Sequence, residues 1–235
     1  MRLASSTTPT PIKTPVLTTA SNCGRYWANG GFYLRQTRCW GDTAKGAVRL
    51  FADSYHDWGV TASMKVGGAI SAYPDVDKTY TGAPPALSSF PKITSTFTER
   101  QPTAAINFDA EAAYDVWLNP TTANPWNGAT ELMVWVTNHR TRFGNHPTGA
   151  LVGKYKQPTG HTWHVYRTAT SGEIGYVQFA NHTHETVNLL DLFKHAQTLG
   201  YLSAATHLVQ LNFGWELATT AGSHTWRVYA YSLTT

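Results

Sequence analysis

Two acidic residues, Glu131 and Glu216, each lie on a predicted strand whose two faces differ in chemistry. Side chains along a strand alternate between its faces. In residues 130–136 one face is apolar and consists of Leu132, Val134 and Val136. The other face consists of Glu131, Met133 and Trp135. A carboxylate beside a thioether and a large aromatic ring is typical of a sugar-binding cleft with an acid in it, although an edge strand with a solvated Glu131 would show the same pattern.

Residues 207–216 repeat this design. The apolar face consists of His207, Val209, Leu211, Phe213 and Trp215. The opposite, mostly polar face consists of Leu208, Gln210, Asn212, Gly214 and Glu216. A glycine inside a strand often marks close approach of a ligand or of another backbone. Each of the two strands therefore presents one Glu on a face unlike its core face.

A pair of carboxylates on either side of a glycosidic bond is the usual machinery of a glycoside hydrolase. One protonates the leaving oxygen, and the other attacks the anomeric carbon or activates water. The nucleophile must be ionised and the acid protonated, so the protein has to keep two similar pKa values apart. The pattern predicts such a hydrolase. The alternative is a carbohydrate-binding module without catalysis, in which both acids would only accept hydrogen bonds from sugar hydroxyls.

The composition indicates one well-packed, β-rich domain. The chain has 235 residues, with 14% charged and 13% aromatic residues, including nine Trp and twelve Tyr. That balance argues against disorder and favours pleated sheets. The net charge of +4 is modest, and Lys and Arg form no run that would follow phosphates, so we expect no nucleic-acid partner. We also expect no membrane partner, since no apolar run is long enough to span one. A monomer is the default expectation.

The two cysteines and the first twenty residues bear on the compartment. Cys23 and Cys39 flank a Gly-rich turn and are predicted either to form a disulfide or to remain two free thiols. A disulfide would fit an oxidising, extracellular location, and we expect a secreted protein. Residues 1–20 are rich in Thr, Ser and Pro and are predicted to be a flexible tail before a single domain at residues 21–235.

Short β-type segments separated by turn residues predict a sandwich or barrel. The predicted strands are 31–38, 47–53, 62–67, 69–73, 95–100, 104–118, 131–137, 151–155, 161–169, 174–180, 207–215 and 224–232. The Pro- and Gly-rich segment after Tyr73 is predicted to be a long loop. Residues 186–199 have apolar residues at helical spacing and end before Gly200, which predicts one helix packed outside a sheet.

Several motifs together resemble glycoside hydrolase family 12. They are Glu131-Leu132-Met133-Val134-Trp135, Phe213-Gly214-Trp215-Glu216, Ala113-Tyr114-Asp115-Val116-Trp117-Leu118, Tyr73-Pro74 and Trp40-Gly41. The resemblance covers about residues 23–234. It implies a β-jelly-roll sandwich of two antiparallel sheets with one external α-helix, and an endo-acting β-1,4-glucanase of the cellulase type.

The resemblance also implies roles for individual residues. Glu131 would be the nucleophile, Glu216 the general acid and then base, and Asp115 a neighbour that sets the ionisation of Glu131. The mechanism would retain the anomeric configuration, with the two catalytic carboxyl groups about 5–5.5 Å apart, and would need neither a cofactor nor a metal. Candidate substrate-binding residues are Trp40, Tyr73, Met133, Trp135, Pro147 and Asn212, with Tyr33 and Trp117 as further candidates for stacking.

The sequence departs from the family pattern at several positions, and other functions remain as alternatives. Thr37, Arg38 and Cys39 replace the asparagines that the family usually places before Trp40. Glu111 is predicted to be a rim carboxylate, with an extra cleft acid as the alternative. The cluster His182-Thr183-His184-Glu185 suggests a metal site, but a solvated loop is the favoured interpretation because further ligands are not evident. Related hydrolases of xyloglucan or xylan are the remaining alternatives.

Overall fold

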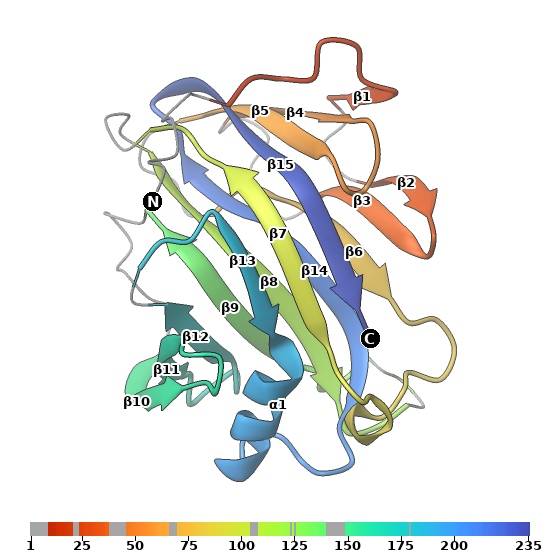
Figure 1. Cartoon of the computed structure of the whole chain (residues 1–235), viewed down its shortest axis with the longest axis vertical. Helices are drawn as coiled ribbons and strands as arrows, with labels where there is room; N and C mark the ends of the chain where they lie inside the picture. The colour runs from red at the N-terminus through yellow and green to blue at the C-terminus, as the bar shows by residue number, and fades with distance from the viewer. Residues whose placement is uncertain are drawn as a thin grey trace.

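The computed structural model describes residues 9–20, 24–37, 46–65, 70–103, 108–122, 124, 126–139, 149–178 and 180–235. Strands make up most of these residues and form two sheets, which confirms the predicted all-β sandwich (Figure 1). The six-stranded sheet has the order β1-β4-β5-β15-β7-β13, and the nine-stranded sheet has the order β10-β11-β12-β9-β8-β14-β6-β3-β2. Figure 1 shows β15, β7 and β13 crossing in front of β14, β8 and β9.

The strands of the six-stranded sheet, in spatial order, are Leu17–Thr19, Gly46–Ala52, Trp58–Met64, Gly222–Thr234, Thr94–Arg100 and His184–Asn188. Those of the nine-stranded sheet are Ala150–Lys156, Thr162–Arg167, Ile174–Gln178, Thr130–Asn138, Asp109–Asn119, His207–Thr219, Tyr73–Thr79, Phe32–Thr37 and Arg25–Asn29. All described strand pairs are antiparallel except β12 with β9, which run parallel with Ile174 opposite Leu132.

The core lies between the two sheets. The predicted core face of β9 is fully buried there, as is the apolar face of β14 from Leu211 to Trp215. Aromatic pairs join the layers: Trp58 of β5 lies 5.0 Å from Trp215 of β14, and Phe97 of β7 lies 4.8 Å from Phe213, measured between ring centroids. Such contacts dominate core energetics. Because one face of β9 and β14 is taken up by this core, their alternate side chains must point to the opposite face of the sheet.

The helix α1, Leu189–Thr198, starts three residues later than the spacing predicted. Residues 184–188 instead pair with β7 as strand β13. Asn188 then caps the helix, because its side chain accepts a hydrogen bond from the Asp191 backbone N–H at 3.2 Å. The predicted stop is confirmed, since Gly200 follows the helix with a φ of 72°. Tyr155 of β10 and Tyr176 of β12 hydrogen-bond to α1, so the helix supports that end of the nine-stranded sheet.

Three predicted loops or tails are partly strands. Leu17–Thr19, within the predicted tail, pairs with β4, where Thr18 donates to the Leu50 carbonyl at 3.2 Å. Tyr73–Thr79 is strand β6 between β14 and β3, although the segment after Tyr73 was predicted to be a loop. His184 begins β13, and Glu185, predicted to be solvated, is buried. In each case the strand depends on a partner strand far away in sequence, which local composition does not reveal.

Gly214 of β14 lies in close contact with the backbone of β6. A methyl group at Gly214 would lie 2.7 Å from Cα and 2.9 Å from Cβ of Asp75, and would collide with the Pro74 carbonyl oxygen. These neighbours are mostly backbone and cannot move without breaking the ladder between β14 and β6. Of the two alternatives that the sequence left open at Gly214, a ligand or another backbone, the structure shows the backbone of β6.

Replacing Gly214 with Ala is therefore expected to destabilise the fold by about 1–3 kcal/mol or more through overpacking. Gly153 of β10 is the matched control, because no atom would lie within 4 Å of an added methyl group there. Denaturant unfolding of both variants measures the difference. Equal stabilities of Gly214→Ala and Gly153→Ala would show that the approach of β6 is looser than described.

Glu99 of β7 is buried in the core beside Trp215. Its carboxylate accepts hydrogen bonds from Gln101 Nε2 at 3.1 Å and from Trp215 Nε1 at 3.4 Å. Burial raises the pKa of Glu99 from 4.5 to about 8, although both hydrogen bonds act in the opposite direction. The folded protein thus keeps a proton that the unfolded chain releases above pH 4.5.

This proton makes stability depend on pH. The contribution of Glu99 is fully present below pH 4.5 and is lost as the pH rises to about 8. We expect Glu99→Gln, which cannot ionise, to show a flatter fall in stability across this range than the wild type. Urea unfolding at several pH values measures it, and parallel curves for the two proteins would contradict a proton on Glu99.

Candidate active site

The sheet places Asp115, Glu131 and Glu216 on three adjacent strands. In the register of β8 with β9, Trp117 lies opposite Glu131 and Asp115 opposite Met133. In the register of β14 with β8, Asn212 lies opposite Asp115. Opposite residues share a face of a sheet, so all three acids lie on the face that points away from the core. Acids that are 16 to 101 positions apart along the chain are thus brought together by strand pairing.

These acids line one pocket of about 470 Å³ on the nine-stranded sheet. Its described lining consists of Arg25, Arg35, Ile70, Tyr73, Asp115, Trp117, Trp126, Glu131, Gln210, Asn212 and Glu216. Carboxylates and indole rings in one hollow are suited to binding a sugar, because the rings stack on its apolar face while polar groups bind its hydroxyls.

Burial and like charges keep protons in this pocket. Burial raises the pKa of Asp115 well above its usual range, and the charges of Glu131, Glu216 and Asp75 raise it further. Burial also raises the pKa of Glu131 to about 8, and the charges of Glu173 and Glu216 add to this. Neighbouring carboxyl groups titrate as a unit, so ionisation of one keeps the proton on the next. The pocket can therefore hold a carboxylate beside a carboxylic acid, as general acid and nucleophilic catalysis require.

Tyr73 and Asn212, two of the predicted substrate-binding residues, line the pocket. Tyr73 is only 2% exposed, and its hydroxyl donates to the Ala113 carbonyl oxygen at 3.1 Å. Burial, followed by the charges of Asp115, Asp75 and Glu216, raises the pKa of Tyr73 well above its usual value. Tyr73 thus forms a fixed, neutral wall of the pocket and offers a sugar little ring surface for stacking.

Met133 and Trp135 share the face of Glu131 but do not line this pocket. They form a separate buried cluster with Ala113, Tyr166 and Val177. Both residues are almost fully buried, at 6% and 2% exposure, so in this structure they support the sheet beside Glu131. Glu111, predicted to be a rim carboxylate, is fully buried on β8 opposite Glu216, so the rim interpretation is wrong.

Several pocket residues were not predicted from the sequence. Gln210 shares the polar face of Asn212, so the alternation along β14 could have identified it. Trp126 is 50% exposed in a turn, with its ring centroid 6.2 Å from that of Trp117. No periodicity marks a turn residue, and only its exposed indole ring points to binding. Arg25 and Arg35 belong to an ion-pair network that no local pattern reveals.

Four predicted residues, Trp40, Pro147, Cys23 and Cys39, lie outside the described part of the chain. Tyr33 is described, on β3, where the Arg25 guanidinium lies 4.5 Å from its ring centroid. In the described residues Tyr33 does not line the pocket.

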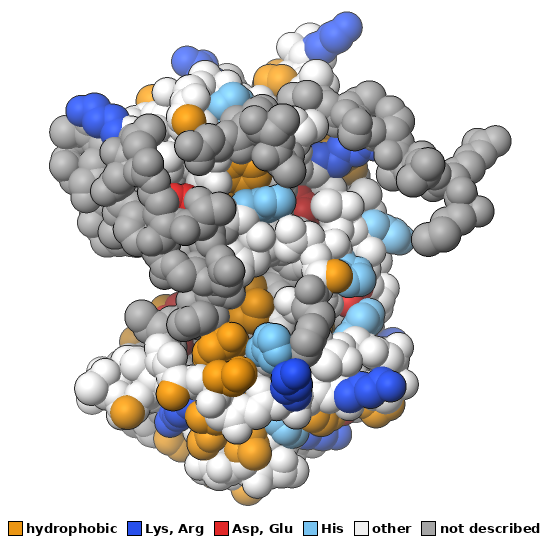
Figure 2. Space-filling model, turned by 90° about the vertical axis from the view of Figure 1, so that its left-hand side faces the viewer, with side chains coloured by type: hydrophobic (Ala, Val, Ile, Leu, Met, Phe, Trp, Pro, Cys, Tyr) orange, Lys and Arg blue, Asp and Glu red, His pale blue; other side chains and the backbone are white. Residues whose placement is uncertain are grey.

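Several histidine side chains are exposed on the face of the molecule that Figure 2 shows. His161 Nε2 lies 2.7 Å from Glu185 Oε1, and His182 Nδ1 lies 3.8 Å from Glu185 Oε2. Gln178 Nε2 donates to both oxygens of the same carboxylate. Within the described ranges, no group of three or more His, Cys, Asp or Glu residues is arranged to hold a metal ion. The same residues also contain no helix with the length and hydropathy that crossing a membrane requires.

Solved structures of similar fold are glycoside hydrolases. The xyloglucanase domain of NopAA from Sinorhizobium fredii, solved with cellobiose, has a TM-score of 0.75 and 19% identity, over 94% of this chain and 99% of that one. The family 12 xyloglucanase from Bacillus licheniformis has a TM-score of 0.77 and 21% identity, over 93% and 99%. The endoglucanase Cel12A from Rhodothermus marinus has a TM-score of 0.77 and 22% identity, over 93% and 98%. At these identities the similarity establishes the fold, a jelly-roll sandwich.

The sequence itself identifies the family. No match was found among curated proteins. Residues 40–235, however, match the sequence profile described as Glycosyl hydrolase family 12. This match covers well over half of the chain and includes the strands that carry Asp115, Glu131 and Glu216. The chain therefore belongs to glycosyl hydrolase family 12.

Proposed function

We propose that this glycoside hydrolase is an endo-acting β-1,4-glucanase with a retaining, double-displacement mechanism. The observation that carries the proposal is the convergence of Asp115, Glu131 and Glu216 in one pocket that two indole rings also line. A binding module gains nothing from placing two buried acids and a partly buried one together, because their repulsion and desolvation cost stability. A hydrolase needs them, since it must hold one proton and one charge beside the same bond.

Glu131 is the proposed nucleophile and Glu216 the proposed general acid. Glu216 donates its proton to the leaving glycosidic oxygen while a Glu131 carboxylate oxygen bonds to the anomeric carbon. Glu216 then takes a proton from water, and the resulting attack releases Glu131 from the glycosyl ester. This sequence requires the two carboxyl groups to lie about 5–5.5 Å apart. Asp115, one strand from Glu131, takes the proton that Glu131 must give up before it can attack.

The position of the acids in the sheet favours an internal cut. They lie on the central strands β9, β8 and β14. On one side the sheet continues through β6, β3 and β2, and on the other through β12, β11 and β10. A polysaccharide that crosses the sheet can therefore contact it on both sides of the bond to be cleaved. Because such a polymer is too large to enter a cell, we propose that the protein acts outside it.

A β-1,4-glucan is the proposed substrate class. Among the similar structures, a xyloglucanase domain was solved with cellobiose, and another is an endoglucanase. Xyloglucan shares the β-1,4-glucan backbone and is the second candidate, supported by the xyloglucanases among these structures.

We expect the wild-type protein to release reducing sugar from carboxymethylcellulose, barley glucan or xyloglucan, and little from xylan. An internal cut also lowers the viscosity of the polymer early in the reaction. These assays on the four polymers rank the substrates. Release from xylan alone, or from none of the four, would contradict the proposed substrate class.

Glu131→Gln is expected to reduce hydrolysis by several orders of magnitude while the fold and glucan binding persist, since the amide is nearly isosteric but cannot form the ester. Asp53→Asn is the control, because Asp53 is exposed and lies in the bend between β4 and β5 of the six-stranded sheet. Initial rates, circular dichroism and glucan retention on a gel measure the three properties. Near wild-type hydrolysis by Glu131→Gln would remove its proposed role.

Asp115→Asn is expected to lower the rate and to move the pH profile of kcat/KM to lower pH. The sign follows from charge, because removing a neighbouring acid weakens the repulsion that raises the pKa values of the others. A shift on the order of one pH unit is expected. Rates between pH 4 and 9, at about half-unit steps, measure it. An unchanged profile would show that Asp115 does not share a proton with the catalytic acids.

A further inference from the structure

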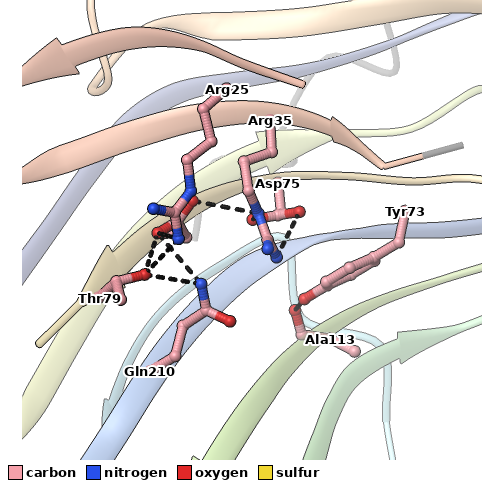
Figure 3. Close-up of polar contacts among 8 residues, drawn as sticks. Arg25, Arg35, Tyr73, Asp75, Thr79, Ala113 and Gln210 are labelled. Atoms are coloured by element: carbon pink, nitrogen blue, oxygen red, sulfur yellow. Dashed lines mark hydrogen bonds and ion pairs between the residues drawn. The ribbon is translucent and has the colours of Figure 1, made fainter. Parts of the chain in front are cut away.

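An ion-pair network runs along the side of the pocket away from Glu131. Arg35 Nε donates to Asp75 Oδ1 at 3.0 Å, and Arg35 Nη2 donates to Asp75 Oδ2 at 3.1 Å. Arg35 Nε also lies 3.1 Å from Asp77 Oδ2. Arg25 reaches Asp77 at 3.4 Å and Thr79 at 2.7 Å. Figure 3 shows the Arg35 guanidinium beside Asp75, on the same side of the sheet as Tyr73 and Gln210.

The network is buried where it meets the acids. The side chains of Asp75 and Asp77 are fully buried, and that of Arg35 is 19% exposed. The room for it comes from Gly214, which lies opposite Asp75 and has no side chain. Burial alone would lower the pKa of Arg35, but the charges of Asp75 and Asp77 raise it above its usual value. Arg35 is thus a permanent cation in the wall of the pocket that also contains the three carboxyl groups.

The geometry points to Arg35 and Asp75 as a positioning pair whose two opposite charges, held at fixed places beside the acidic pocket, set where in the pH range the enzyme works. This inference rests on the proposed function, because it concerns the same three acids. Arg35 is the positive member of the pair and Asp75 the negative member. Both act on Asp115 and Tyr73 across β6 and β14, without touching the bond that is cleaved.

The charged and titratable groups around Asp115 come from five strands. Glu131 lies on β9, Glu216 on β14, Asp75 and Tyr73 on β6, and Arg35 on β3, while Glu111 lies on β8 itself. Of these, Glu131, Glu216 and Asp75 raise the pKa of Asp115 and Arg35 lowers it. Tyr73 shows the same opposition between Asp75 and Arg35. Outside this group, Glu173 acts on Glu131.

Substrate binding explains Arg35 less well. A guanidinium that binds an acidic sugar must present free N–H groups to it. In Arg35, however, Nε and Nη2 donate hydrogen bonds to Asp75, and Nε also lies beside Asp77. The two arginines and two aspartates of the network also cancel in charge. What the network supplies is a fixed dipole, with its positive end on Arg35 and its negative end on Asp75.

Because Arg35 and Asp75 have opposite charges, removing the charge of one should shift the pH profile of kcat/KM in the opposite direction from removing the charge of the other. Arg35→Gln leaves Asp75 without its main counter-charge, so the pH profile of kcat/KM should move to higher pH, by about one unit. Asp75→Asn leaves Arg35 in excess, so the profile should move to lower pH by a similar amount. The double variant removes both charges, and its profile should return close to that of the wild type.

Arg227→Gln is the matched control. Arg227 forms the same forked pair with Asp57, at 2.9 and 2.8 Å, on the six-stranded sheet. Its loss changes the net charge by the same amount as Arg35→Gln does, but should leave the pH profile unchanged. Arg35→Lys, which keeps the charge, should retain the wild-type pH position even if its rate is lower. If Arg35→Gln does not fold, the test is the shift of Asp75→Asn to lower pH compared with the unshifted Arg35→Lys.

The experiment is the pH dependence of kcat/KM for the wild type and these variants on the best of the four polymers. Opposite shifts that cancel in the double variant support the pair. Profiles that all coincide with the wild type, or that shift in the same direction for Arg35→Gln and Asp75→Asn, overturn it. A wild type that is inactive on all four polymers would instead count against the proposed function, so the two failures are distinguishable.

Discussion

The structure depends on keeping several carboxyl groups of like charge buried on one face of a sheet. Asp115, Glu131 and Glu216 lie within one pocket, and Asp75 and Asp77 lie beside them without exposure to solvent. Such groups are stable together only if some keep their protons and others have a counter-charge. The pocket uses both means: burial and like charges raise the pKa values of Asp115 and Glu131, so that the neighbouring acids can share a proton, and Arg35 is placed against Asp75 and Asp77.

The pleat of the nine-stranded sheet makes this arrangement possible. Alternate residues of β9 and β14 fill the core between the sheets, and this fixes the strands in register. The side chains between them, including Glu131 and Glu216, must then point to the opposite face of the sheet. The packing of their neighbours in the core therefore fixes the position of these acids. A shift of register by one residue would bury Glu131 in the core and move Leu132 into the pocket. The position of the acids thus depends on the same core packing that stabilises the fold.

Much of this site could be predicted from the sequence because it depends on local alternation. The period of two in residues 130–136 and 207–216 identified the core faces, the acid faces and the close approach at Gly214. What could not be predicted depends on partners far away in the chain. Strand β6 contains Pro74, Asp75 and Asp77, all of which are disfavoured in strands. The two aspartates form ion pairs with Arg35 of β3 and Arg25 of β2, which local composition does not reveal.

The same distinction explains the remaining differences. Helix α1 starts after β13 because β7 offers residues 184–188 a ladder, and nothing in their helical spacing reveals that. Trp126 reaches the pocket from a turn, where no periodicity exists to place it. Met133 shares the face of Glu131 as the alternation predicts, yet its neighbours bury it, since burial on a curved sheet depends on what covers each strand.

The most direct test of the central claim is to trap the covalent intermediate. A 2-deoxy-2-fluoro-cellobioside with a good leaving group forms the glycosyl ester but slows its hydrolysis, so the nucleophile stays labelled. Peptide mapping by mass spectrometry then identifies the labelled carboxylate. Our account predicts one label, on the peptide that contains Glu131, and none in Glu131→Gln. A label on another acid, or steady hydrolysis that yields inverted product without any label, would contradict it.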